Sequence, residues 1–75
     1  MKQYKLKYRK ALIAELIRIK VKQNKNVLPV LSSIAHSGFT NFPFDLIENE
    51  IKQYYISLGG TNEDVENLLT ELEYY

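Results

Sequence analysis

The fold is decided by the stretch KQYKLKYRKALIAELIRIKVKQNKN, residues 2–26, because its apolar residues fit both a strand and a helix. Apolar and basic residues alternate over residues 4–8 and 17–21, as in a half-buried strand. Between them, residues 11–17 are rich in strong helix formers. A strand pair would need a turn near residues 11–14, and the sequence ALIA contains no turn residue. The length of the stretch, without Gly or Pro, therefore predicts a helix over about residues 3–23.

On a helical wheel this segment carries two apolar stripes. The first consists of Tyr4, Tyr8, Ala11, Leu12, Leu16 and Ile19. The second lies roughly opposite and consists of Leu6, Ile13 and Ile17. A helix in a single bundle buries one stripe, so the second is either covered by another helix or exposed as an interaction patch.

The same segment holds almost all of the positive charge. Residues 1–25 contain nine Lys or Arg and one Glu, a balance of 9 − 1 = +8, whereas residues 26–75 contain one Lys and eight acids, a balance of 1 − 8 = −7. This division predicts that the basic helix faces acids of the other helices or of a symmetry mate. Because an exposed ion pair contributes only about 0–1 kcal/mol, such pairs select orientation and partner more than they stabilise.

Three further helices are predicted over residues 27–37, 43–58 and 62–74. Thr61 and Asp64 have the spacing of a capping box at the start of the last helix. The short LGGT connection before it predicts that the last two helices fold back as an αα-hairpin. We therefore expect a small all-α, four-helix domain that spans residues 1–75.

Composition limits the chemistry that is available. The chain has 75 residues, one His and no Cys, so we expect no disulfide, no metal site and no cofactor. No segment approaches the ~20 apolar residues of a membrane span, and residues 11–14 are too short for a signal-peptide core. A cytoplasmic protein is expected. A chain this short has marginal stability, and self-association or binding to a partner is the most plausible source of additional stability.

An enzyme is not expected. His36 lies near Ser32, Ser33 and Ser37, but no orienting acid or oxyanion motif accompanies them. The Gly-rich SLGGTNED segment is followed by acids in the first turn of a helix, and these would repel a phosphate.

Two functions remain open. The favoured one is a small non-enzymatic protein-interaction or regulatory module, self-associating through its N-terminal helix, with contacts from Leu6, Ile13 and Ile17 and with Lys20 and Lys22 at the rim. The alternative is nucleic-acid binding by a basic arm over residues 2–10, in which lysines follow the backbone and tyrosines stack on bases. Its residues are Lys2, Tyr4, Lys5, Lys7, Tyr8, Arg9 and Lys10. A membrane-surface helix ranks last, since basic residues occupy several faces and Trp is absent.

Overall fold

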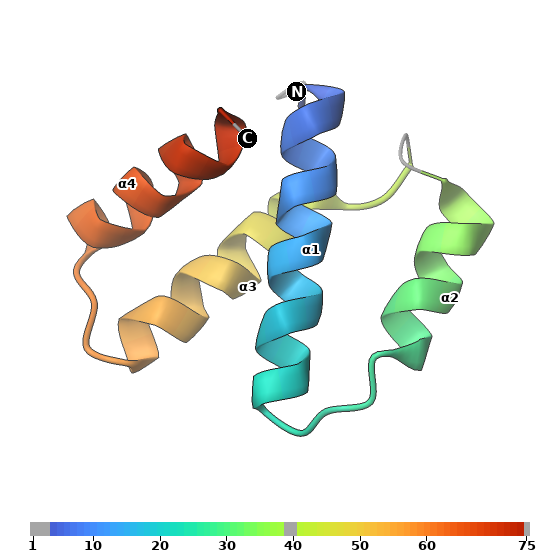
Figure 1. The fold of residues 1–75 in the computed structure, drawn as a ribbon, viewed down its shortest axis with the longest axis horizontal. Coiled ribbons are helices and arrows are strands. Elements are labelled where there is room, and N and C mark those ends of the chain that lie inside the picture. Colours follow the sequence, from blue (N-terminus) through green and yellow to red (C-terminus); the bar gives the residue numbers. More distant parts are fainter. Residues whose placement is uncertain (1–3, 39–40, 75) are drawn as a thin grey trace.

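The computed structural model describes residues 4–38 and 41–74, and this part of the chain forms four α-helices and no strand (Figure 1). The helices are α1 (Leu6–Lys22), α2 (Leu28–Ser37), α3 (Phe44–Ser57) and α4 (Asn62–Glu73). The predicted all-α class is confirmed, and so is the choice of helix over strand for the N-terminal segment. α1 begins later than predicted, because Lys5 has an extended backbone and stands at the N-cap position.

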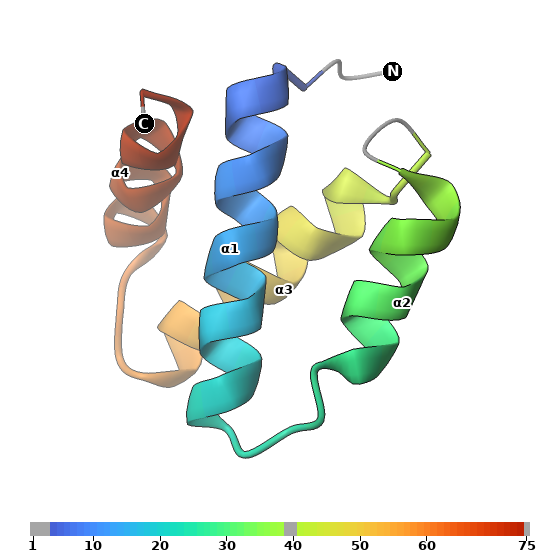
Figure 2. The same cartoon turned by 45° about the vertical axis from the view of Figure 1, so that its right-hand side comes forward.

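The core lies where α1, α3 and α4 meet. In Figures 1 and 2, α1 stands between α4 and α2, and α3 crosses behind it. The first predicted stripe of α1 supplies most of its buried side chains, because that stripe faces both α3 and α4. The buried apolar residues are Tyr4, Tyr8, Leu12, Ile13, Leu16, Ile19, Phe44, Ile47, Ile51, Val65, Leu69 and Leu72.

The predicted αα-hairpin between α3 and α4 is confirmed, and two backbone devices fix its turn. At the end of α3, the Gly59 N–H donates to the Ile56 carbonyl and the Gly60 N–H to the Tyr55 carbonyl, both at 3.0 Å. This is a Schellman cap, and Gly59 supplies its left-handed residue with φ of +96°. A Cβ at Gly60 would lie 2.9 Å from the Tyr55 carbonyl oxygen, so the close approach requires glycine.

The capping box of α4 is confirmed. The Thr61 hydroxyl accepts from the Asp64 N–H at 3.1 Å, and the Asp64 carboxylate accepts from the Thr61 N–H at 3.1 Å. These bonds, chiefly the one from the Thr61 backbone, hold the pKa of Asp64 below its ordinary value. The start of the hairpin's second helix is therefore fixed locally.

α2 is attached differently from the other helices. None of its residues is buried, although it is apolar in composition. Val30 and Ile34 pack against the core from its edge, whereas Leu28 is 65% exposed and Leu31 is also exposed. α2 therefore covers one side of the core with a single thin row of side chains.

Candidate protein-binding surface

The second apolar stripe of the N-terminal helix is not an exposed patch. Leu6 is 55% exposed, but Ile13 is only 6% exposed and belongs to the core. Ile17 is half-buried and packs against the core as well. Ile13 is therefore enclosed by the chain itself and Ile17 is partly covered by it, which corrects the expectation that both stand on the surface for a partner.

The two rim lysines differ in their surroundings. Lys20 forms an ion pair with Glu50 and so links α1 to α3. Lys22 is exposed in the last turn of α1, where a cation interacts favourably with the helix dipole. Lys20 thus meets an acid of its own chain, as the charge division predicted, and Lys22 remains on the surface.

The basic arm does not present its tyrosines. Tyr4 and Tyr8 are buried, with their rings stacked at 5.6 Å between centroids. The Tyr4 hydroxyl donates to Asp45 and the Tyr8 hydroxyl donates to Glu48 at 2.9 Å. Burial, followed by these hydrogen bonds to carboxylates, raises the pKa of both tyrosines. The predicted stacking platform is wrong, because both rings face α3 instead of solvent.

The cations of the arm divide between surface and interior. Arg9 is half-buried, with its guanidinium over the Phe44 ring at 5.6 Å from the centroid. Lys5, Lys7 and Lys10 are exposed. Lys2 lies outside the described residues. The exposed lysines keep their charge on the surface, but no aromatic ring of this arm accompanies them there.

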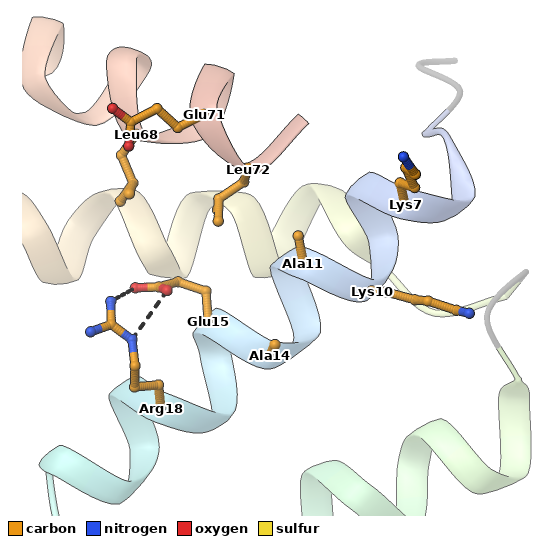
Figure 3. Close-up of a pocket in the computed structure, with 9 residues that line it drawn as sticks. All are labelled: Lys7, Lys10, Ala11, Ala14, Glu15, Arg18, Leu68, Glu71 and Leu72. Carbon is orange, nitrogen blue, oxygen red and sulfur yellow. Dashed lines mark hydrogen bonds and ion pairs between the residues drawn. The ribbon is translucent and has the colours of Figure 1, made fainter. Parts of the chain in front are cut away.

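A hollow of about 660 Å³ lies on the surface between α1 and α4 (Figure 3). We call it the α1–α4 groove. Its residues recur at intervals of three and four along each helix, so each helix contributes one face. They are Lys7, Lys10, Ala11, Ala14, Glu15 and Arg18 of α1, and Leu68, Glu71 and Leu72 of α4.

Small side chains keep this groove open. Ala11 and Ala14 stand at the middle of the α1 face, where longer residues would fill the space against α4. Leu68 and Leu72 project from α4 toward α1, and Ala11 faces Leu72 in Figure 3. The floor is therefore apolar and partly exposed, which is the character of a surface that gains from being covered.

Glu15 is the buried charge of the groove, only 8% exposed. Arg18 donates to its carboxylate through Nε at 3.2 Å and again through Nη2. The Tyr55 hydroxyl of α3 also donates to it, and Arg18 contacts that hydroxyl at 2.6 Å. The hydrogen bond to Glu15 raises the pKa of Arg18, and burial, followed by the bond to Glu15, raises the pKa of Tyr55 to about 12. Glu15 thus accepts hydrogen bonds from Arg18 of its own helix and from Tyr55 of α3.

The two walls of the groove carry opposite charges. Lys7 and Lys10 stand exposed on the α1 wall, with Arg18 further along it. Glu71 stands exposed on the α4 wall. A groove of this kind orients a partner, because a complementary surface must place acids over α1 and a base over α4.

Sequence reasoning did not single out the groove. The helical wheel places Ala11 in the buried stripe and Ala14 in neither stripe. The available signal was the pair of alanines three residues apart, flanked by Lys7, Lys10 and Arg18. The sequence could not show that α4 lies beside this face at a distance that leaves it open.

Residues suited to other chemistry do not come together in the described part of the chain. His36 is exposed, with Nδ1 3.0 Å from the Ser32 carbonyl, and the Ser33 and Ser37 hydroxyls donate to carbonyls one helical turn back. Residues 4–38 and 41–74 contain no cluster of three potential metal ligands. Within those same ranges, every helix is too short or too polar to cross a bilayer.

Comparison of the chain with protein-family models, curated proteins and solved structures finds no match in any of the three.

Proposed function

We propose that this chain is a small, non-enzymatic protein-interaction or regulatory module of the cytoplasm, and that it binds a protein partner through the α1–α4 groove. One observation carries the proposal: a hollow with an apolar floor lies between a basic wall and an acidic wall. The absence of Cys fits the proposed location, since small secreted domains commonly rely on disulfides.

A helix is the form of partner that this groove suits. An amphipathic helix places apolar side chains in a groove and charged side chains along both edges. The methyl groups of Ala11 and Ala14 permit close approach of a backbone at the middle of the floor. The N-terminal helix thus keeps the central role assigned to it from the sequence, but through its Ala11–Ala14 side.

Nucleic-acid binding is less well supported. Among the described side chains predicted for this role, only lysines are exposed, because Tyr4 and Tyr8 are buried against α3. The hydrogen-bond acceptors of these tyrosines are Asp45 and Glu48, whose negative charge lies beside the arm and would oppose a phosphate backbone.

The proposal is tested by substituting the centre of the floor. Ala14 is exposed, so Ala14→Glu preserves the fold while it places a longer charged side chain in the groove. Affinity capture with the tagged full chain from its own cells, followed by titration of the purified partner, should show a loss of binding of at least about tenfold.

Ala35→Glu is the matched control, because Ala35 is an exposed alanine of α2, outside the groove. It should bind as the unaltered chain does. Equal binding by both variants would show that the partner uses another surface, and capture of no protein, including a second copy of the chain, would refute the proposed function.

A further inference from the structure

We infer that α2 is a hinged cover: it opens as a unit while α1, α3 and α4 stay packed, and it then uncovers an apolar face of α1 and α3. The α1–α4 groove takes no part in this opening, because α2 and α4 lie on opposite sides of α1 in Figures 1 and 2. Three features lead to the inference: how α2 is held, what lies beneath it and how its ends are connected.

α2 is held to the rest of the chain at its edge alone. α1, α3 and α4 pack on one another and each supplies buried side chains to the core, whereas α2 supplies none. Val30 and Ile34 reach the core only as half-buried side chains. In the described part of the chain, the hydrogen bonds of α2 side chains end inside α2 or at the residue after it. Opening therefore breaks apolar contacts at the edge of the core and no polar bond from an α2 side chain to another helix.

The border beneath α2 is incompletely packed. A hollow of about 300 Å³ lies there, lined by Leu16 of α1, Val30 of α2 and Ile47 of α3 among others. A hollow reduces the dispersion attraction between α2 and the helices beside it. Leu16 and Ile47 are each only 3% exposed with α2 in place, so they belong to the face that gains solvent when α2 opens. The Lys20–Glu50 ion pair joins α1 to α3 at the same border without any residue of α2.

Both ends of α2 have a hinge. At its C-terminal end α2 stops at Gly38, whose φ of +65° and ψ of −164° are accessible essentially to glycine alone. At its other end, the N–H groups of Asn24 and Lys25 donate to carbonyls of the last turn of α1 at 3.1 and 2.8 Å, so α1 is closed before α2 begins. Residues 26–27 are thus a short link, and α1 keeps its own end when α2 moves.

A detached α2 should not persist as a helix. It has ten residues, and an isolated helix of this length is marginal in water. Three of the ten are serines, and the hydroxyls of Ser33 and Ser37 donate back to carbonyls one turn earlier, which weakens rather than supports a helix. The amides of α2 therefore lose their hydrogen bonds in the open state, so hydrogen exchange measures the opening.

Native-state hydrogen exchange of the full chain, followed by NMR, tests this cover. The amides of α2 should be protected at least about tenfold less than the slowest amides of α1 and α3. Val65 of α4 is buried and stays buried when α2 opens. Val65→Ala should therefore speed the slowest amides of α1, α3 and α4 about tenfold and leave those of α2 unchanged. Val30→Ala is the matched variant, because it removes the same two methyl groups from α2 itself, and it should speed the amides of α2.

Thr61→Ala gives the same contrast, at about fivefold, if Val65→Ala does not fold, because it weakens only the start of α4. Amides of α2 that speed up as much as the core amides in these variants overturn the inference, because α2 would then open only when the whole chain unfolds.

A second variant holds the cover open. Ser33 is exposed in the interior of α2, where proline removes a backbone hydrogen bond and clashes with the preceding turn. In Ser33→Pro, NMR chemical shifts should show helix lost over residues 28–37 and kept in α1, α3 and α4. The dye anilinonaphthalene sulfonate should bind more strongly than it does to Ser33→Ala, the control of equal charge, because Leu16 and Ile47 become accessible. Loss of all four helices, or equal dye binding by the two variants, overturns the inference.

Discussion

At the scale of single residues, Glu15 joins the groove to the core. It is the one acid among the first 25 residues, and it is buried between Arg18 of α1 and Tyr55 of α3. A buried carboxylate is tolerated only when its oxygens are hydrogen-bonded, and here two donors provide those bonds. The Tyr55 hydroxyl therefore does more for stability than a half-buried hydroxyl ordinarily would.

Tyr55→Phe removes this hydroxyl and keeps the ring. We expect the free energy of unfolding to fall by about 1 kcal/mol, because one bond to a buried acceptor is lost while the bonds from Arg18 remain. Urea denaturation followed by circular dichroism measures the change. Tyr54→Phe is the control, since its ring meets that of Tyr55 edge-on at 5.2 Å but its hydroxyl is outside the Glu15 cluster. Equal midpoints for the two variants would contradict the role given to the Tyr55–Glu15 bond.

The exposure predicted for Ile13 and Ile17 from the sequence is wrong for one physical reason. A helical wheel gives the angle of Ile13 and Ile17 around α1, but the extent of burial depends on how many neighbours surround the helix. α1 is contacted by α3 and α4, and it lies beside α2, so its buried surface is wider than one stripe. Ile13 is thus enclosed, and the exposed part of α1 lies instead along Lys10, Ala14 and Arg18.

At the scale of elements, the helix ends were predicted best where a residue acts locally on the backbone. The ends of α2, α3 and α4 lie within one residue of the predicted ones, because Pro29, Gly59 and Thr61 set them locally. The strand-like alternation in α1 was outweighed by its central helix formers and by the absence of a turn residue. The open groove was not predictable, since it depends on the spacing between two helices far apart in sequence.

The capping box of α4 offers a direct test at this scale. Thr61→Ala removes the side-chain acceptor of the Asp64 N–H and should lower the free energy of unfolding by about 1 kcal/mol. Thermal or urea unfolding monitored by circular dichroism measures the loss. Thr70→Ala, on the same helix, should be neutral or slightly stabilising, because the Thr70 hydroxyl only bonds back to the Glu66 carbonyl. A loss at Thr70 as large as that at Thr61 would contradict a specific capping effect.

At the scale of the whole molecule, the basic N-terminal helix interacts with acids of the same chain in two ways. Lys20 pairs with Glu50, as opposite charges were expected to do. Tyr4 and Tyr8 also bring the basic helix to acids, Asp45 and Glu48, through neutral hydroxyl donors. The sequence predicts apolar packing or base stacking for these two tyrosines. A helical wheel does not show that their hydroxyls lie beside carboxylates of α3.

Because of these tyrosines, the stability of the whole fold should decrease as the pH becomes strongly alkaline. Burial, followed by hydrogen bonding to carboxylates, raises the pKa of Tyr4, Tyr8 and Tyr55 in the folded chain, to about 12 for Tyr55. In the unfolded chain each tyrosine has a pKa of about 10. The unfolded state therefore releases these protons first, so the stabilisation is complete below about pH 10 and is lost as pH rises above it.

Urea midpoints measured by circular dichroism at increasing pH should consequently fall more steeply above about pH 10 for the unaltered chain than for Tyr8→Phe. Lysines lose their protons over the same range in both proteins, so the difference between the two slopes isolates the tyrosine. Tyrosinate absorbance should rise together with the loss of helix, because the buried hydroxyls ionise when the fold opens. A tyrosine titration centred near pH 10 in a chain that stays helical would mean that the hydroxyls do not face Asp45, Glu48 and Glu15. The basic helix would then be held to α3 by apolar contacts and by the Lys20–Glu50 ion pair.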